Sequence, residues 1–239
     1  MDRELILDLE ERSARAMPAA ETVRLGRWLM SIGRGEVSRL NSAVTFGESP
    51  RRELFERIEA VERRYLSRGR DPKFRLTVLD HHLDERLHTR GYDRGPEVIV
   101  MTGPVGGGTD GTVAVARAAG PTWLDRYAEW GGHGELRTAE IGESLGSLTL
   151  DMGAFMSPAA IGVAVVDGGW VGLFDLITDP DQRRRGHGRA MTETMLAWAA
   201  TQGAERSYLQ VVSTNEAAIA MYDDFGFTET YRYWYRTEF

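Results

Sequence analysis

The residues best suited to chemistry lie in the segment DPDQRRRGHGRA, residues 179–190. It follows an apolar stretch at 170–177 that is typical of a strand buried on both faces, and it leads into a helix predicted at 188–202. A turn from strand to helix leaves backbone N–H groups unpaired at the positive end of the helix dipole. Because glycine lets a ligand approach closely, Gly186 and Gly188 predict a phosphate-binding loop. Its arginines are Arg183, Arg184, Arg185 and Arg189.

The glycine spacing separates this loop from the two commonest phosphate-binding loops. A Walker loop ends in Gly-Lys-Ser or Gly-Lys-Thr, which is absent here, and a dinucleotide loop needs a third glycine where Met191 stands. The pattern Arg183-x-x-Gly186-x-Gly188 instead resembles the R/Q-x-x-G-x-G/A signature of the GNAT N-acetyltransferase superfamily, whose loop binds the pyrophosphate of coenzyme A.

A second motif, NEAAIAMYDDFGF, begins at Asn215. Asn215 suits a helix N-cap, Gly226 suits a helix end, and Tyr222 suits the core face of an amphipathic helix. Each residue therefore has an ordinary structural interpretation. However, the motif follows the arginine-rich loop and the strand-like residues 208–212, and in this order it also resembles the second GNAT signature. The resemblance is close over about the last 70 residues and looser over the roughly 45 residues before them.

This resemblance implies an α/β (α+β) GNAT fold, a mixed central sheet flanked by helices. It also implies acetyl-CoA as donor, a primary amine of a small molecule or protein as acceptor, and direct attack of the amine. The Leu176 N–H would polarise the thioester carbonyl, and Tyr222 would protonate the leaving thiolate. The residues that the resemblance assigns to coenzyme binding are Leu176, Ile177, Thr178, Arg183, Arg184, Arg185, Gly186, His187, Gly188, Arg189, Asn215 and Tyr222.

The group that takes a proton from the amine is harder to assign. Many superfamily members use a glutamate on the strand before the loop, but the matching position here is near Gly172. Asp175 is the nearest carboxylate on that strand, and a purely structural role for it stays open. The terminal carboxylate of Phe239 is a further candidate. The aromatic residues that could line either an acceptor pocket or a core are Trp123, Tyr127, Trp130 and Trp170.

Composition excludes several other kinds of site. The 239 residues include no cysteine, which rules out disulfides, thiolate metal sites and cysteine catalysis, and the five histidines lack metal-ligand spacing. A net charge of −7 disfavours nucleic acid as a ligand and suits a cationic acceptor. Without a signal-peptide pattern or an apolar run of membrane-spanning length, we expect a cytoplasmic protein, monomeric or homodimeric, that binds no membrane.

The elements that must position these residues alternate between helix and strand, which favours an α/β or α+β layer structure. Five glycines and a proline in 102–111 mark a boundary between two halves. We expect a degenerate GNAT-like domain at 1–105 and an acetyl-CoA-binding GNAT domain at 111–239. Gly91 and the strand after it echo Gly226, but no glycine-rich loop precedes them. A plain N-terminal extension on one GNAT domain is the alternative.

The pattern of apolar and turn residues predicts the individual elements. Helices are expected at 5–14, 50–69, 83–89, 123–130, 188–202 and 215–225. Strands are expected at 24–32, 37–44, 74–79, 98–101, 112–116, 170–177, 208–212 and 227–236, with a strand pair within 154–166.

Two other functions are compatible with these residues. One is a non-catalytic acetyl-CoA-binding regulatory module, because no base is evident. The other is an acyltransferase that uses a different acyl group or a hydroxyl acceptor, which would differ mainly in the shape of its pocket.

Overall fold

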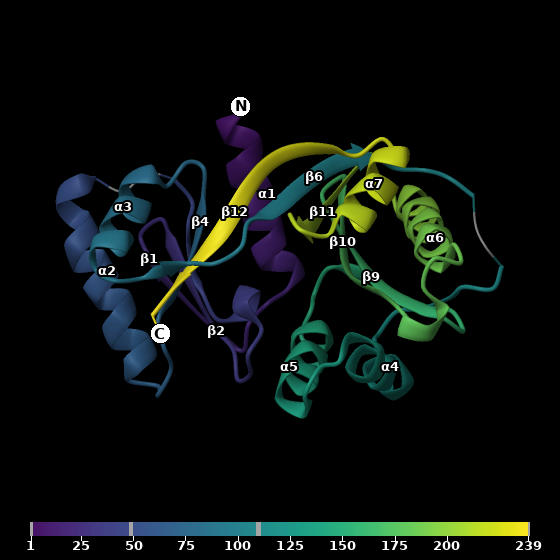
Figure 1. The fold of residues 1–239 in the computed structure, drawn as a ribbon, viewed down its shortest axis with the longest axis horizontal. Helices are drawn as coiled ribbons and strands as arrows, with labels where there is room; N and C mark the ends of the chain where they lie inside the picture. The colour runs from purple at the N-terminus through teal and green to yellow at the C-terminus, as the bar shows by residue number, and fades with distance from the viewer. Residues whose placement is uncertain (1, 48–49, 109–110, 239) are drawn as a thin grey trace.

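The computed structural model describes residues 2–47, 50–108 and 111–238. Its described strands form one twelve-stranded sheet with both parallel and antiparallel pairs, and helices cover both faces (Figure 1). Alternate residues of a strand point to opposite faces. Along the strand 160–167, Val163 and Val165 join one hydrophobic core while Ala160 and Ala164 join another. The expected mixed α/β class is therefore confirmed.

The first half of the chain supplies one end of the sheet and the helices on the left of Figure 1. Its helix α2 buries Leu54, Ile58, Val61 and Tyr65 on one face, as the helical spacing predicts. The elements of this half are α1 (Arg3–Ala16), β1 (Glu21–Leu25), β2 (Trp28–Ile32), the 3₁₀ turn η1 (Ser38–Leu40), β3 (Ala43–Thr45), α2 (Arg51–Leu66), β4 (Lys73–Thr77), α3 (His81–Thr89), β5 (Asp93–Arg94) and β6 (Val98–Pro104).

The second half contains the predicted loop and both motifs. Its central strand β10 is fully buried over its first five residues, which agrees with the apolar run in the sequence. The elements of this half are β7 (Ala114–Ala116), α4 (Pro121–Gly131), α5 (Glu135–Gly146), β8 (Asp151–Met156), β9 (Ala160–Asp167), β10 (Trp170–Thr178), η2 (Pro180–Gln182), α6 (His187–Thr201), β11 (Arg206–Val212), α7 (Glu216–Asp224) and β12 (Thr228–Thr237).

Two predicted segments differ from the structure, and one helix was missed. The single strand expected at 24–32 is a hairpin of β1 and β2, because Gly26 takes the left-handed conformation (φ 64°) and reverses the chain. The strand expected at 37–44 is instead η1 followed by the short strand β3. Helix α5 was not predicted, because it combines two glycines with few apolar residues.

The two halves exchange strands in the centre of the sheet. The sheet order β4-β12-β6-β11 places β6, from the first half, between two strands of the second. The long strand β12 pairs with β6 through residues 228–233 and with β4 through residues 233–237. Figure 1 shows β6 and β12 running side by side across the molecule. Neither half therefore completes its part of the sheet from its own residues.

The N-terminal helix α1 also crosses between the halves. It precedes the first-half strands in sequence but packs against β9 and β10 of the second half. Arg15 donates two hydrogen bonds to the Asp167 carboxylate at the end of β9. Glu10 forms a buried ion pair with Arg75 of β4 at 2.6 Å, and it accepts a hydrogen bond from the Tyr231 hydroxyl. These contacts fix the two halves to each other.

None of the described helices combines the length and the apolar composition that a membrane-spanning helix needs.

Candidate active site

The strands β10 and β11 diverge after running side by side. Their parallel pairing begins at Trp170 and Arg206 and ends at Leu173 and Leu209. Beyond that point β11 continues against β6, while β10 continues against β9 as far as Thr178. Within the described part of the chain, no strand pairs with residues 176–178 on their β11 side, so their backbone can pair with an extended ligand.

The arginine-rich loop turns from β10 into α6 through two left-handed residues. Arg184 has φ 63° and Gly186, the N-cap of α6, has φ 87°. The first backbone hydrogen bond of α6 runs from the Ala190 N–H to the Gly186 carbonyl. The N–H groups of the three residues 187–189 precede that bond, at the positive end of the helix dipole. This end of the helix can bind an anion.

A cavity of about 930 Å³ joins the open edge of β10 to the start of α6. It contains every residue predicted for coenzyme binding except Arg185 and Tyr222. Its lining residues are Trp130, Gly131, His133, Leu176, Ile177, Thr178, Arg183, Arg184, Gly186, His187, Gly188, Arg189, Asn215, Ala217, Ala218, Ala220, Met221 and Asp224. The motif residues thus come together from β10, α6 and α7 in one site.

The arginines of the loop have different surroundings. Arg183 and Arg184 line the cavity without a salt bridge to any described residue. Arg189 also lines it, but its guanidinium is paired with the carboxylate of Asp224 on α7. Arg185 lies outside the lining and donates to the Gln182 side chain at 2.8 Å. The cavity therefore keeps a positive wall at the helix N-terminus.

Helix α7 forms the opposite wall. Asn215 caps it, because its Oδ1 accepts a hydrogen bond from the Ala218 N–H at 3.2 Å, and the same residue lines the cavity. Three small lining residues, Ala217, Ala218 and Ala220, let a ligand approach this helix closely. The signal for them in the sequence is the run of alanines inside the second motif.

Tyr222 is buried beneath α7, with 8% of its surface exposed. Its ring contacts Phe227 at 5.8 Å between centroids, within the hydrophobic core under α6 and α7. Among the described residues, no hydrogen-bond partner of its hydroxyl is found. Burial raises the pKa of Tyr222 to about 12, so the phenol keeps its proton at neutral pH.

Asp175 is not among the residues that line the cavity, and it forms an ion pair with Arg39 of the first half. Its carboxylate lies 2.5 Å from the guanidinium of Arg39, and only 11% of the Asp175 side chain is exposed. Asp175 has φ 47°, an uncommon conformation for a residue with a side chain, at a bulge between Phe174 and Ile177. Its second carboxylate oxygen is buried without a partner among the described residues.

The other residues considered for proton transfer or acceptor binding are distributed unevenly. A Cβ at Gly172 would lie 2.5 Å from the Phe174 ring, so a glutamate cannot fit there. Phe239 lies outside the described residues. Of the four aromatic residues considered, Trp130 alone lines the cavity described above.

Two lining residues, Gly131 and His133, were not predicted, and their signal in the sequence is the segment WGGHG at 130–134. Among the described residues, no cluster of potential metal ligands is found.

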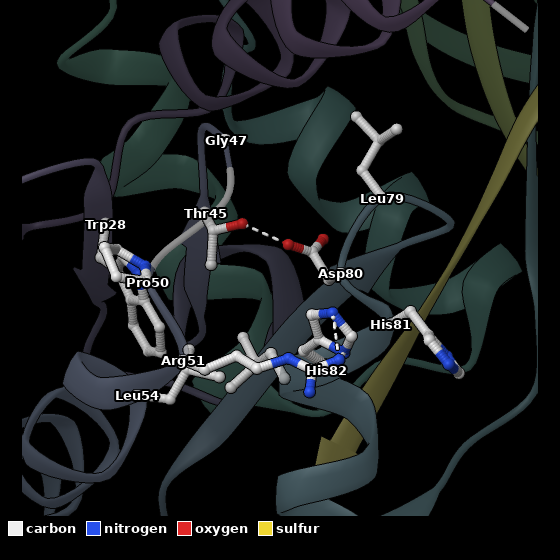
Figure 2. Close-up of a pocket in the computed structure, with 11 residues that line it drawn as sticks. Trp28, Thr45, Gly47, Pro50, Arg51, Leu54, Leu79, Asp80, His81 and His82 are labelled. Atoms are coloured by element: carbon white, nitrogen blue, oxygen red, sulfur yellow. Dashed lines mark hydrogen bonds between the residues drawn. The ribbon is translucent and has the colours of Figure 1, made fainter.

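The matching place in the first half has a different construction. There β3 and β4 run parallel, as β10 and β11 do, and α3 follows β4 as α7 follows β11. Asp80, at the N-cap position that Asn215 holds on α7, accepts hydrogen bonds from the Thr45 hydroxyl at 2.5 Å and from the Thr77 N–H at 2.8 Å. Figure 2 shows the contact between Thr45 and Asp80 beside a cavity of about 320 Å³. The carboxylate thus ties together the ends of β3 and β4.

Comparison with known proteins gives a consistent result over nearly the whole chain. Residues 5–236 match the family described as "Probable histone acetyltransferase Rv0428c C-terminal". The chain is 25% identical to the "Uncharacterized N-acetyltransferase YobR" of Bacillus subtilis (strain 168) over 244 residues, which cover 97% of this chain and 98% of that protein.

Two solved structures share the fold. A GCN5-related N-acetyltransferase from Kribbella flavida superimposes with a TM-score of 0.71 at 14% identity, covering 97% of this chain and 95% of the other. A tandem GNAT protein from the clavulanic acid biosynthesis pathway superimposes with a TM-score of 0.59 at 12% identity, covering 96% and 87%. At such identities the likeness concerns the fold alone.

Proposed function

Since the chain belongs to the Rv0428c C-terminal family of GNAT N-acetyltransferases, we propose that it moves an acetyl group from acetyl-CoA to a primary amine of a small molecule or a protein. The observation that carries this proposal is the single cavity that extends from the unpaired end of β10 to the N-terminus of α6. A thioester with a long amide-containing arm and a pyrophosphate needs both features in one groove.

Coenzyme binding would use the backbone at both ends of the groove. Residues 176–178 would pair with the pantetheine amides in the manner of an added strand. The N–H groups of His187, Gly188 and Arg189 would hold the pyrophosphate, with Arg183 and Arg184 supplying positive charge. Support comes from the open strand edge and from the two left-handed residues in the loop.

The chemical step would be direct attack of the amine on the thioester carbonyl. The Leu176 N–H would stabilise the oxyanion that develops, because a donor that the strand already holds in place costs no reorganisation. The C–S bond then breaks, and the thiolate takes a proton from the Tyr222 hydroxyl. The Tyr222 phenol carries its proton at neutral pH, as a general acid must, and Tyr222 directly follows the lining residue Met221 on α7. Much of the rate would come from positioning the two reactants.

The first half, residues 1–105, would bind no coenzyme. In place of the loop it has the segment FGESPRR at 46–52, with one glycine, and Asp80 adds negative charge to the cavity at the start of α2. Calorimetry with acetyl-CoA should therefore give one site per chain. A second site of similar affinity that is still present in Gly188→Val would contradict the proposal that the first half binds no coenzyme.

The proposal is tested by release of free thiol from acetyl-CoA in the presence of amines. A suitable panel contains a lysine-bearing histone-tail peptide, spermidine and 2-phenylethylamine, because the matched family is described by a histone substrate. Thiol release that depends on one amine, with the acetylated amine seen by mass spectrometry, supports the proposal. Coenzyme binding without transfer to any amine would favour the regulatory module, and transfer only from longer acyl-CoA donors would favour the other acyltransferase.

A further inference from the structure

The histidine that follows helix α4 occupies a site built for it. Gly132 takes the left-handed conformation (φ 63°) that ends α4, and His133 comes directly after it. The imidazole lies against the Tyr127 ring, with 4.5 Å between the centroids. A Cβ at Gly131 would lie 2.4 Å from Nε2 of His133, so this glycine leaves the space that the imidazole fills. The segment WGGHG thus fixes where the imidazole lies.

His133 lies in the wall of the same cavity as the open end of β10. It shares that lining with Leu176, whose N–H is the proposed oxyanion donor. Among the described residues, no side-chain hydrogen bond of His133 is found, so its ring nitrogens are available to a ligand. The other candidates on β10 are unsuitable, because Asp175 is paired with Arg39 and Gly172 has no room for a side chain.

The charged groups around His133 favour its neutral form. Burial lowers the pKa of His133 below its ordinary value of 6.5, and the Arg137 guanidinium on α5 lowers it further. Asp175 on β10 opposes this shift, although its charge is shared with Arg39 from η1. Tyr127 on α4 accepts a hydrogen bond from Arg137 at 3.1 Å and stays protonated because burial raises its pKa. The imidazole is therefore neutral at pH 7 and can accept a proton.

We propose that His133 is the catalytic residue that takes the proton from the attacking amine, an assignment that rests on the proposed acetyl transfer. The ammonium form of the acceptor gives one proton to the imidazole and becomes a nucleophile. Its nitrogen forms the bond to the carbonyl carbon and the C–S bond breaks. The thiolate takes the proton of the Tyr222 hydroxyl, and the second proton lost from the nitrogen restores that hydroxyl. His133 then passes its proton to solvent, while Asp175 stabilises the transient imidazolium.

The test is the pH profile of kcat in the full-length chain with His133→Gln. With acetyl-CoA and spermidine, or the panel amine that the wild type acetylates best, wild-type kcat should fall on the acid side through a pKa below 6.5. His133→Gln should lose this limb and lower kcat at pH 7 by about 10²–10⁴-fold, the usual range for a general base. The KM for acetyl-CoA should change by less than about 2-fold, and the kcat ratio should shrink at high pH, where the amine deprotonates unaided.

Two further variants separate a catalytic role from a structural one. Gly131→Ala keeps His133 but removes the space for its ring, so it should lower kcat in the same direction. His88→Gln, on the exposed face of α3, should leave kcat unchanged. If the wild type acetylates no amine, that result alone contradicts the proposed function. The kcat of His133→Gln relative to the wild type is then measured on acetyl-CoA hydrolysis, where water must give up the proton. A His133→Gln enzyme with wild-type kcat and acid limb, or with only a raised KM for acetyl-CoA, would overturn the assignment.

Discussion

The two halves of the chain place a parallel strand pair before a helix in the same way, yet only the second pair opens. Beyond their last paired residues, β10 and β11 separate and leave the backbone of residues 176–178 unpaired. Beyond theirs, β3 and β4 are held together by Asp80, which accepts hydrogen bonds from Thr45 and Thr77. The groove between β10 and β11 and the closed junction between β3 and β4 thus differ in the few residues that follow the paired segments.

The comparison also shows what the closed half contributes to the open one. Its loop 33–39 is anchored to α5 by the buried carboxylate of Glu140, which accepts hydrogen bonds from the Gly35 and Val37 N–H groups at 2.9 and 2.7 Å. The same loop carries Arg39 to Asp175 on β10. The first half therefore supports the bulged strand beside the groove instead of forming a second groove.

The largest expected effect concerns the arginine-rich loop at 179–190, which the first half lacks. A Cβ at Gly188 would contact Thr178, Met221 and Leu176 at 3.5–3.7 Å, so the further methyl groups of Gly188→Val would extend into the groove. We expect acetyl-CoA binding to be abolished while the melting temperature is kept, as measured by calorimetry and thermal unfolding. Gly120→Val, at an open N-cap, is the control. A folded Gly188→Val chain with unchanged affinity would place the coenzyme elsewhere.

The next largest effect should come from removing the Tyr222 hydroxyl of α7. The first half has no hydroxyl at the matching position of α3, which is Leu87. Tyr222→Phe should lower kcat by about 10²–10⁴-fold with little change in acetyl-CoA affinity, because general-acid help acts in the transition state. Tyr235→Phe serves as the control. A melting temperature many degrees lower would show that the hydroxyl has a structural role, and unchanged turnover would show that another group protonates the thiolate.

A smaller effect is expected where the halves meet. Arg39→Met leaves the Asp175 carboxylate buried without its partner, which should lower the free energy of unfolding by about 3–5 kcal/mol. The double variant with Asp175→Asn should recover part of that loss, as measured by denaturant unfolding. Arg34→Met, which removes an exposed pair with Glu143, should cost less than about 1 kcal/mol. Equal losses in both single variants would mean that the Arg39 pair does not brace the strand.

The smallest effect tests the closed junction through pH. Burial raises the pKa of Asp80 from 3.8 to about 6, so between these values the folded chain holds a proton that the unfolded chain has lost. The free energy of unfolding should then fall by about 2–3 kcal/mol as pH rises through that window. Asp80→Asn should remove this dependence, whereas exposed Asp93→Asn should keep it. A pH slope that is the same in Asp80→Asn and the wild type would contradict the assignment.

The sequence predicted the parts of the site that are local. The loop at 183–189 and the helix capped by Asn215 are each continuous in sequence, so glycines, arginines and a capping residue reveal them directly. The amphipathic helix α2 was equally clear from its apolar spacing. These features depend on interactions between residues a few positions apart.

The features that were not predicted depend on contacts between distant residues. The pairing of β6 with β12 joins strands more than a hundred residues apart, and no periodicity records such a partner. The Arg39 and Asp175 pair is 136 residues apart in sequence, so the strand aspartate looked like a possible base instead of half of an ion pair. In the sequence, His133 was considered only as a metal ligand, because the space that Gly131 leaves for its ring becomes visible only in the structure.

The exchange of β6 and β12 also constrains the order in which the chain can fold during synthesis. The edge of β4 and one edge of β6 stay uncovered until β12 arrives, and β12 follows every other strand in chain order. An uncovered strand edge is a template for pairing with other chains. A nascent chain that pauses before residue 228 would therefore expose both edges at once, that of β4 and that of β6, and removal of β12 should cause aggregation through either strand.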